Sequence, residues 1–254
     1  MSSLYFNQLV RLAGQHGSLA EQQLLSRWQS ELTDFFGPAD RALMNNALGL
    51  EIGIEDTLAL KINLKSRNLG AVPSLLAIAR QSPRLMPWVD AILAQQLRFH
   101  CGIKITPTAL SREIYVYPKD HQQIAHLLDD PVLQDAITTV KPLFLGIDDH
   151  RGCSMYFPAA QTEWVNHLLT ELGLPDWQGA EIWPWQQLRY DGTALIPGKT
   201  AIELHPLPAG VLARLATHYP FPCFRYLIPL KNHRSGNFGR DPVTGRFALY
   251  AGVN

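Results

Sequence analysis

The feature that most constrains this chain is a pattern of hydrophobicity that recurs in five successive units. In each unit, a stretch with the period of a helix precedes two stretches with the period-2 alternation of strands. The units share this layout but no recurring residue identity. Strands that come in adjacent pairs joined by short turns pair antiparallel. The sequence therefore predicts ten antiparallel strands, with one helical stretch for each pair.

The five units can be placed along the chain. We expect helices near residues 4–36, 71–96 (kinked at Pro83 and Pro87), 119–138 (broken near Pro131), 161–172 and 207–217. We expect strand pairs at 48–54 and 57–65, 98–105 and 112–117, 143–148 and 152–157, 183–190 and 199–205, and 224–231 and 246–253. A polar, glycine-rich loop is expected over 233–245. A TIM barrel needs a helix after every strand, so the pairs favour another fold. We predict an α/β (α+β) fold: a closed, antiparallel ten-stranded barrel of five αββ units with helices outside.

Composition narrows the class of protein. The 254 residues are 46% hydrophobic and carry a formal net charge of zero, which gives no argument for a nucleic acid or membrane partner. Cys101, Cys153 and Cys223 are far apart and in no CxxC spacing, which argues against disulfides and a zinc site. The sequence contains no GxSxG, P-loop or GxGxxG motif, and we expect neither a signal sequence nor a linker between domains. We expect residues 1–254 to form a single domain in the cytoplasm.

Polar side chains occupy one face of several predicted strands. In TLALKINLK (57–65) and EIYVY (113–117), one face is apolar and the other carries Lys, Asn, Glu and Tyr. If the apolar face meets the helices, the polar face lines the barrel. The charged and hydroxyl-bearing residues predicted to point inward are Glu51, Lys61, Asn63, Lys65, His100, Lys104, Glu113, Tyr115, Tyr117, Asp148, Tyr156, Arg189, Glu203, His205 and Tyr250. Lysines and tyrosine hydroxyls suit a polyanion such as a pyrophosphate, and tyrosine rings suit a carbocation. The alternative is that some lysines and Arg189 lie near strand ends and reach solvent.

Glu51 stands out because its strand is otherwise apolar. Its neighbours on the same face are Gly49 and Gly53, which would let a ligand approach the backbone closely. Burial of a carboxylate without a partner costs several kcal/mol. Glu51 is therefore either a general base beside a substrate or the partner of an inward Lys or Arg.

Four segments, in this order, resemble the ABBA-type aromatic prenyltransferases, and most of all the cyanobactin peptide prenyltransferases. They are LEIGIEDTLALKINL (50–64), CGIKITPTALSREIYVYPKDHQQIAHLL (101–128), LGIDDHRGCSMYF (145–157) and residues 246–251. The resemblance is patchy but covers most of the chain. It implies a barrel of five αββα units that moves a dimethylallyl group from its diphosphate to a peptide side chain, including those of macrocyclic cyanobactin-type peptides. It also implies Mg²⁺ bound with the diphosphate, for which the sequence offers no ligand cluster.

The resemblance can be carried over residue by residue. Glu51 matches a glutamate that lies beside the acceptor, and Lys61 or Asn63 falls where the family has a basic pyrophosphate ligand. Tyr156 and Tyr250 match tyrosines that shield the allyl group. The family commonly has an acid near position 104 and a base near 113, whereas this chain has Lys104 and Glu113. The two could face each other across the hairpin, as a pair with exchanged ends.

We therefore predict three groups of site residues. The catalytic residue is Glu51, and the diphosphate ligands are Lys61, Asn63, Lys104, Tyr115, Tyr156 and Tyr250. The acceptor ligands are Asp148, Glu203, His205 and His100, whose carboxylates suit a cationic guanidinium. The alternatives are a small aromatic acceptor, and a non-catalytic barrel that binds a prenyl diphosphate or an anionic lipid. The acceptor side chain, the isoprene length and the oligomeric state stay open.

Overall fold

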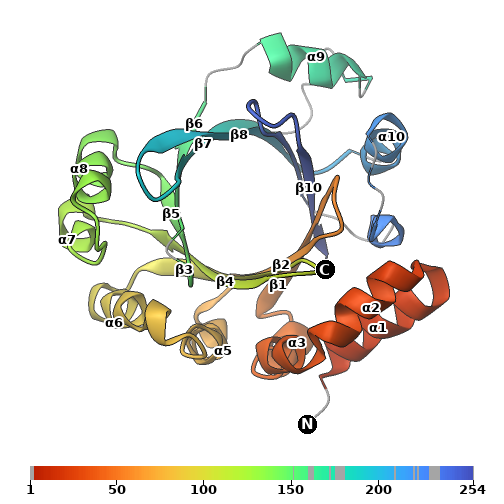
Figure 1. The fold of residues 1–254 in the computed structure, drawn as a ribbon, viewed down its shortest axis with the longest axis horizontal. Coiled ribbons are helices and arrows are strands. Elements are labelled where there is room, and N and C mark those ends of the chain that lie inside the picture. The colour runs from red at the N-terminus through yellow and green to blue at the C-terminus, as the bar shows by residue number, and fades with distance from the viewer. Residues whose placement is uncertain are drawn as a thin grey trace.

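The computed structural model describes residues 3–150, 152–159, 163–171, 173–174, 181–208, 210–219, 221, 223–228 and 235–253. In these residues ten antiparallel strands close into a barrel, in the order β1-β10-β9-β8-β7-β6-β5-β4-β3-β2 (Figure 1). The predicted fold is thus confirmed. The strands are β1 Leu48–Glu55, β2 Leu60–Ser66, β3 Arg98–Ile105, β4 Leu110–Tyr117, β5 Phe144–Asp148, β6 Cys153–Pro158, β7 Glu181–Tyr190, β8 Leu195–His205, β9 Gly236–Arg240 and β10 Phe247–Val253.

Helices surround the barrel on its outside (Figure 1). They are α1 Leu4–His16, α2 Leu19–Arg27, α3 Gln29–Phe36, α4 Asp40–Met44, α5 Val72–Ala79, α6 Met86–Gln95, α7 His121–Ala125, α8 Pro131–Val140, α9 Glu163–Glu171 and α10 Val211–His218. The predicted breaks near Pro83 and Pro131 are confirmed, since 3₁₀ turn Pro83–Leu85 separates α5 from α6 and α8 begins at Pro131. None of the helices within the described ranges is long and apolar enough to span a membrane.

The single helix predicted over 4–36 is wrong, because the chain forms three shorter helices there. Gly17 ends α1 with an extended backbone. Ser18 then starts α2 with a reciprocal cap, in which the Ser18 side chain accepts from the Glu21 backbone and Glu21 accepts from the Ser18 N–H at 2.6 Å. Such a cap satisfies amide groups that a continuous helix would bond internally, so the chain gains a second helix start there.

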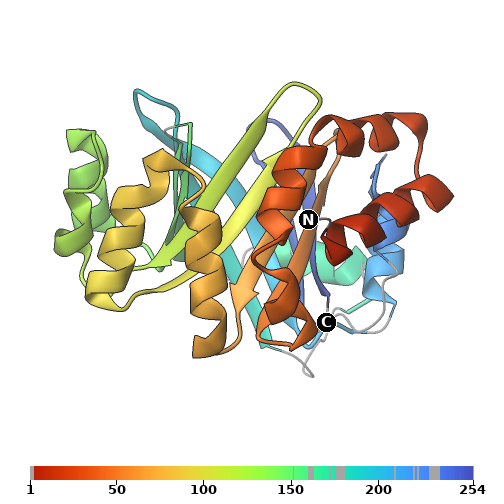
Figure 2. The same cartoon turned by 90° about the horizontal axis from the view of Figure 1, so that it is seen from below.

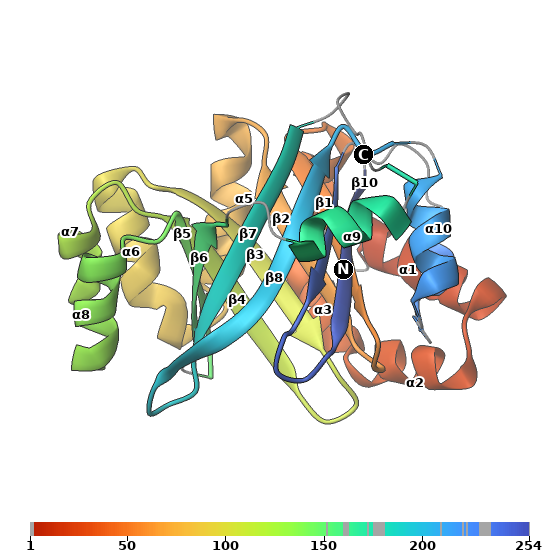
Figure 3. The ribbon, with the colours of Figure 1, turned by 90° about the horizontal axis from the view of Figure 1, so that it is seen from above.

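The alternation along the strands separates an apolar outer face from a polar lumen. On β2, Leu60, Ile62 and Leu64 are buried against the helices, while Lys61 and Asn63 take the opposite face. The same division holds on β4, where Ile114 and Val116 are fully buried outside the barrel. The hydrophobic core therefore lies between the strands and the ring of helices. Figures 2 and 3 show the strands tilted across the barrel wall, with the helices packed along its outside.

The last unit corrects the sequence prediction. The strand expected over 224–231 is wrong for its described part, since Arg225–Leu227 is a 3₁₀ turn; residues 229–231 lie outside the described residues. The ninth strand is β9, inside the expected loop. In its sequence GNFGR, Phe238 is the only large apolar residue, and a glycine stands on each face: Gly236 beside Phe238 and Gly239 on the face of Asn237. At Gly239 a Cβ would lie 3.1 Å from the Ala201 Cβ, so tight packing against β8 favours the small residue.

Candidate active site

A cavity of about 800 Å³ lies inside the barrel. Every residue assigned to the site from sequence lines it except His205, which is exposed and follows Glu203 by two positions on β8. Lys65 and Arg189, for which solvent was the alternative, also line it. Each is part-exposed and paired: Lys65 with Glu51, and Arg189 with Asp241 at 3.4 Å.

The space predicted above Gly53 and Gly49 is filled by the protein itself, so that expectation is wrong. Gly53 lies opposite Tyr250 in the β1–β10 ladder, and a Cβ there would come 2.4 Å from a carbon of the tyrosine ring. A Cβ on Gly49 would meet the Arg67 guanidinium at 3.1 Å. Gly146 has the same relation to Tyr115, at 3.0 Å. The inward glycines at 53 and 146 thus make room for tyrosine rings of neighbouring strands.

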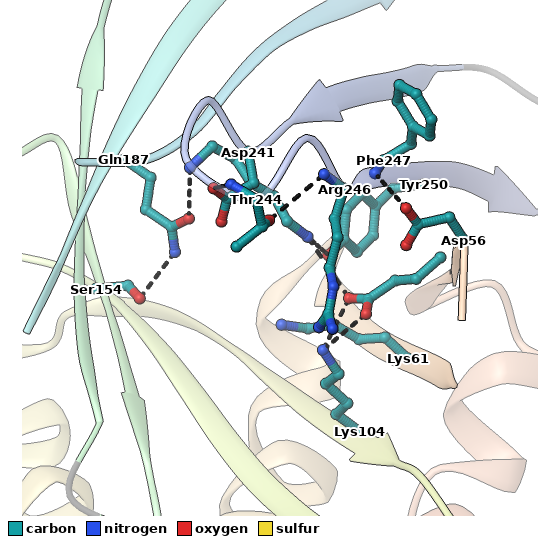
Figure 4. Close-up of polar contacts among 12 residues, drawn as sticks. Asp56, Lys61, Lys104, Ser154, Gln187, Asp241, Thr244, Arg246, Phe247 and Tyr250 are labelled. Carbon is teal, nitrogen blue, oxygen red and sulfur yellow. Dashed lines mark hydrogen bonds and ion pairs between the residues drawn. The ribbon is translucent and has the colours of Figure 1, made fainter. Parts of the chain in front are cut away.

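Three lysines and two glutamates gather at one end of the lumen, and we call this group the lysine cradle (Lys61, Lys104, Lys199, Glu55 and Glu113). Lys61 and Lys104 lie directly opposite each other on β2 and β3. Lys61 Nζ is 2.5 Å from Glu113, and Lys104 Nζ donates to both Glu55 oxygens at 2.8 and 2.9 Å. Lys199 Nζ lies 3.5 Å from the same carboxylate. Figure 4 shows Lys61, Lys104 and Tyr250 together in this part of the barrel.

The proposed exchange of Lys104 and Glu113 across their hairpin is wrong. The register places Lys104 opposite Ser111, and Glu113 opposite Gly102. Each residue instead pairs with a strand other than its hairpin partner: Lys104 with Glu55 of β1, and Glu113 with Lys61 of β2. Tyr115 adds a short hydrogen bond to Glu113. The charges of Lys104 and Glu113 are therefore each neutralised by a different partner.

The two carboxylates of the cradle are largely buried, and their lysine partners favour the ionised form of both. Burial by itself raises the pKa of Glu55, but Lys199 and Lys104 outweigh it and lower that pKa to about 2. Burial likewise opposes ionisation of Glu113, yet Lys61 and Tyr115 lower its pKa. The pKa of Lys199 is lowered, chiefly by burial. Three ammonium groups against two carboxylates leave a net charge of +1 in the cradle.

A second polar group, which we call the Glu51 cluster (Glu51, Asn63, Lys65, His100 and Glu203), lies further along the same strands. Glu51 accepts hydrogen bonds from Asn63 Nδ2 at 2.8 Å and from Lys65 Nζ at 2.6 Å. Burial raises the pKa of Glu203, and the nearby Glu51 adds to this. Burial lowers the pKa of His100 to about 3, with help from Lys65 and Arg98, so this imidazole is neutral. Both glutamates raise the pKa of Lys65.

Two predicted assignments change with these positions. Asn63, predicted as a diphosphate ligand, bonds Glu51 and therefore belongs to the Glu51 cluster. Asp148, predicted beside the acceptor, lies opposite Glu113 at the cradle end. Its Oδ1 accepts from the backbone of His150 and of Gly152, each at 2.8 Å, which holds the β5–β6 turn. Asp148 therefore does not join Glu51 and Glu203.

Aromatic rings line the lumen between the two charged groups, and we call them the aromatic layer (Tyr115, Phe144, Tyr156, Trp185 and Tyr250). Tyr156 stacks on Phe144 with centroids 4.3 Å apart, and contacts Trp185 at 5.3 Å and Tyr115 at 6.1 Å. The Lys61 ammonium lies 5.2 Å from the Tyr115 centroid, and that of Lys199 lies 5.5 Å from Tyr250. Gln187 donates to Tyr156 Oη at 3.2 Å.

Among the lining residues that were missed from sequence, four belong to the lysine cradle or the aromatic layer, and the alternation could have found them. Glu55 shares a face with Glu51 but was assigned to a turn, because β1 was expected to end at residue 54. Each of the other three lies an even number of positions from a residue already predicted to point inward on the same strand, and therefore shares its face: Lys199 with Glu203, Phe144 with Asp148, and Trp185 with Arg189. Period 2 applied to every residue of the true strands would have included all four.

No model of a protein family and no curated protein matches the chain by sequence. Solved structures do share its fold. A 5-dimethylallyltryptophan synthase from Streptomyces coelicolor is 12% identical with a TM-score of 0.54, over 100% of this chain and 97% of that one. Its complex with DMASPP and Trp has a TM-score of 0.57 at 12% identity, over 100% and 95%. A 6-dimethylallyltryptophan synthase from Micromonospora olivasterospora, with the same two ligands, is 11% identical with a TM-score of 0.54, over 81% of each chain.

These likenesses agree with the architecture described above. The chain has the closed ten-stranded barrel of the dimethylallyltryptophan synthases, which is the ABBA fold that the sequence predicts. The acceptor named in both complexes is Trp, so the peptide acceptor stays a prediction.

Proposed function

We propose that this protein is a prenyltransferase that moves a dimethylallyl group from its diphosphate to a side chain of a peptide. The observation that carries the proposal is the order of groups along β1. Glu55 belongs to the lysine cradle, Tyr250 lies across Gly53, and Glu51 follows two residues further. An anion site, an aromatic layer and a carboxylate thus succeed one another, as the leaving group, the allyl group and the nucleophile must.

The cradle suits the donor. Lys61, Lys104 and Lys199 supply ammonium groups to the diphosphate, and they stabilise it as the C–O bond breaks and the electron pair leaves with it. The faces of Tyr115, Tyr156 and Tyr250 stabilise the allyl cation and keep water from it.

The Glu51 cluster suits the acceptor. As the nucleophile bonds to the allyl carbon, it loses one proton, which Glu51 accepts. Lys65 holds that carboxylate at 2.6 Å, and Glu203 lies near enough to raise the pKa of the same ammonium. Two carboxylates beside a single lysine favour a cationic acceptor such as a guanidinium, which can bond a carboxylate through two N–H groups.

An apolar rim supports an acceptor larger than an amino acid. Leu143 is 51% exposed and Trp183 is 56% exposed, and both line the cavity. Trp183 lies opposite Glu203 in the β7–β8 ladder, and Leu143 adjoins Phe144. The rim is thus at the Glu51 end, where neighbouring residues of a peptide would meet it.

The resemblance predicts Mg²⁺ bound with the donor. Within the part of the chain that the structure describes, no group of three or more His, Cys, Asp or Glu is placed to hold a metal ion. Glu55 and Glu113, the carboxylates nearest the lysines, are both held by ammonium groups. Binding of pyrophosphate with and without Mg²⁺ tests the prediction.

The test of function is incubation with dimethylallyl diphosphate and three acceptor conditions: a mixed peptide pool, free tryptophan, and no acceptor. The expected result is a mass increase of one isoprene unit on peptides, with fragmentation locating the modified side chain. Modification of tryptophan alone would favour the small aromatic acceptor that the neighbouring structures bind. Donor binding without transfer to any acceptor would favour a non-catalytic barrel.

A further inference from the structure

The glutamates of the lysine cradle are already bonded to its lysines. Lys104 donates to both oxygens of Glu55, and Lys199 lies 3.5 Å from one of them. Lys61 is bonded to Glu113 at 2.5 Å. A diphosphate that enters must therefore share these ammonium groups with a carboxylate or displace the carboxylate from them.

The lysines that pair with the two glutamates differ in how exposed they are. Glu113 accepts from both Lys61 and Tyr115, and the Lys61 and Glu113 side chains are only 10% and 15% exposed. Lys104 and Lys199, the partners of Glu55, are 32% and 21% exposed. They come from β3 and β8, which are not neighbours in the barrel, so Glu55 of β1 is what joins them. Lys61 also lines the cavity, but Lys104 and Lys199 are the more exposed ammonium groups, so an anion in the cavity reaches them most readily.

The position of Glu55 on its strand also allows its carboxylate to move away from Lys104 and Lys199. It is the last residue of β1, at the turn to β2, whereas Glu113 lies in the middle of β4. A side chain at a strand end has fewer neighbours on its own strand to fix its direction. Its carboxylate can turn away from the lysines without breaking the barrel ladder.

We propose that Glu55 is an internal competitor of the diphosphate: it occupies Lys104 and Lys199 in the empty site and yields both when the donor binds. This rests on the cradle being the diphosphate site of the proposed function. In the empty protein Glu55 compensates and positions these two part-buried cations. After transfer it competes with the released pyrophosphate for the same ammonium groups, which favours product release.

Calorimetric titration with inorganic pyrophosphate, without metal, tests this in the full chain. Glu55→Gln keeps the size of the side chain but removes its charge, so pyrophosphate gains both lysines without displacing an anion. We expect binding to tighten about tenfold or more, since hydrogen bonds to charged groups are the strong ones. Glu203→Gln is the matched control, because it removes one carboxylate from the same cavity outside the cradle, and it should change binding far less. Equal or weaker binding by Glu55→Gln overturns the inference.

Two further results separate this inference from the proposed function. If wild-type protein does not bind pyrophosphate, or if Lys104→Ala binds it as well as wild type, the diphosphate site itself is wrong. If wild type binds more tightly with Mg²⁺ and Glu55→Gln loses that gain, Glu55 is a metal ligand and the inference is overturned.

A crystal structure of the wild-type protein with pyrophosphate gives an answer that does not depend on the folding of a variant. The expected structure has Lys104 Nζ bonded to pyrophosphate and outside hydrogen-bond distance of Glu55. Pyrophosphate bound while Lys104 keeps both bonds to Glu55 overturns the inference.

Discussion

The two charged groups in the lumen are built from the same residue types but have opposite balances. The lysine cradle has three lysines against two glutamates, a net charge of +1. The Glu51 cluster has one lysine, Lys65, against Glu51 and Glu203, a formal net charge of −1. One end of the lumen therefore favours an anion and the other a cation. Alternation alone places all these residues inside, and only the register sorts them into two sites.

The largest expected effect tests whether the two groups act independently. Glu51→Gln should lower the turnover of dimethylallyl transfer by roughly 10²–10⁴-fold, the usual worth of general base catalysis. Pyrophosphate binding should stay as in wild type, because Glu51 bonds Asn63 and Lys65 rather than a cradle lysine. Steady-state kinetics and calorimetry measure the two quantities.

Other results for this variant would redraw the comparison. Unchanged turnover with unchanged donor binding would remove Glu51 from the mechanism and make Glu203 the next candidate. A loss of pyrophosphate binding equal to the loss of turnover would mean that the two groups form one site.

The cradle lysines come next in size. Lys61→Ala or Lys104→Ala should weaken pyrophosphate binding by roughly 1.5–3 kcal/mol, the worth of a hydrogen bond to a charged group. Lys65→Ala is the matched control, since it removes the same charge from the other group. Equal losses from all three variants, measured by calorimetry, would show that the lumen acts as one diffuse positive field.

The part of this arrangement that sequence predicts is the part that repeats. Strict alternation on β1 to β4 puts Glu51, Lys61 and Tyr115 in the lumen, and the five unit layouts predict the closed barrel. The same alternation fails at β9, where the glycines carry no apolar signal. The apolar run from Phe224 resembles a strand, yet it forms a turn whose Phe224 N–H donates to Glu21 at 2.5 Å.

The ion pairs are beyond such patterns because they join distant strands. Lys61 and Glu113 are 52 positions apart, and Lys104 and Glu55 are 49 apart. Both pairs depend on how β1 to β4 are staggered in the barrel. A one-step slip of one strand would turn its inward residues outward. The cost of burying a carboxylate predicts that a glutamate in the lumen needs a cationic partner. Only the strand register decides which lysine that partner is.

A pH dependence of stability distinguishes the Glu51 cluster from the cradle. His100 titrates near pH 3 in the folded protein but at its ordinary 6.5 when unfolded. Below pH 6.5 the unfolded chain binds a proton that the folded protein does not, so stability is complete above 6.5 and falls as pH drops toward 3. The loss from His100 between pH 6.5 and 4.5 should be roughly 2–3 kcal/mol. Denaturant unfolding of wild type and His100→Gln measures it, and parallel curves for the two proteins would contradict the assignment.

The smallest effect concerns the aromatic layer that separates the two groups. In Gly53→Ala the new Cβ would lie 2.4 and 2.6 Å from Tyr250 ring carbons, so the ring must move. Overpacking of this kind costs about 1–3 kcal/mol of stability. The displaced ring should let water reach the allyl cation, so a larger share of donor is hydrolysed rather than transferred. Gly14→Ala on α1, where a Cβ has no neighbour within 4 Å, is the control. Gly53→Ala could be destabilised and still have the wild-type ratio of donor hydrolysis to donor transfer. That result would mean that Tyr250 fills space beside Gly53 but does not shield the cation.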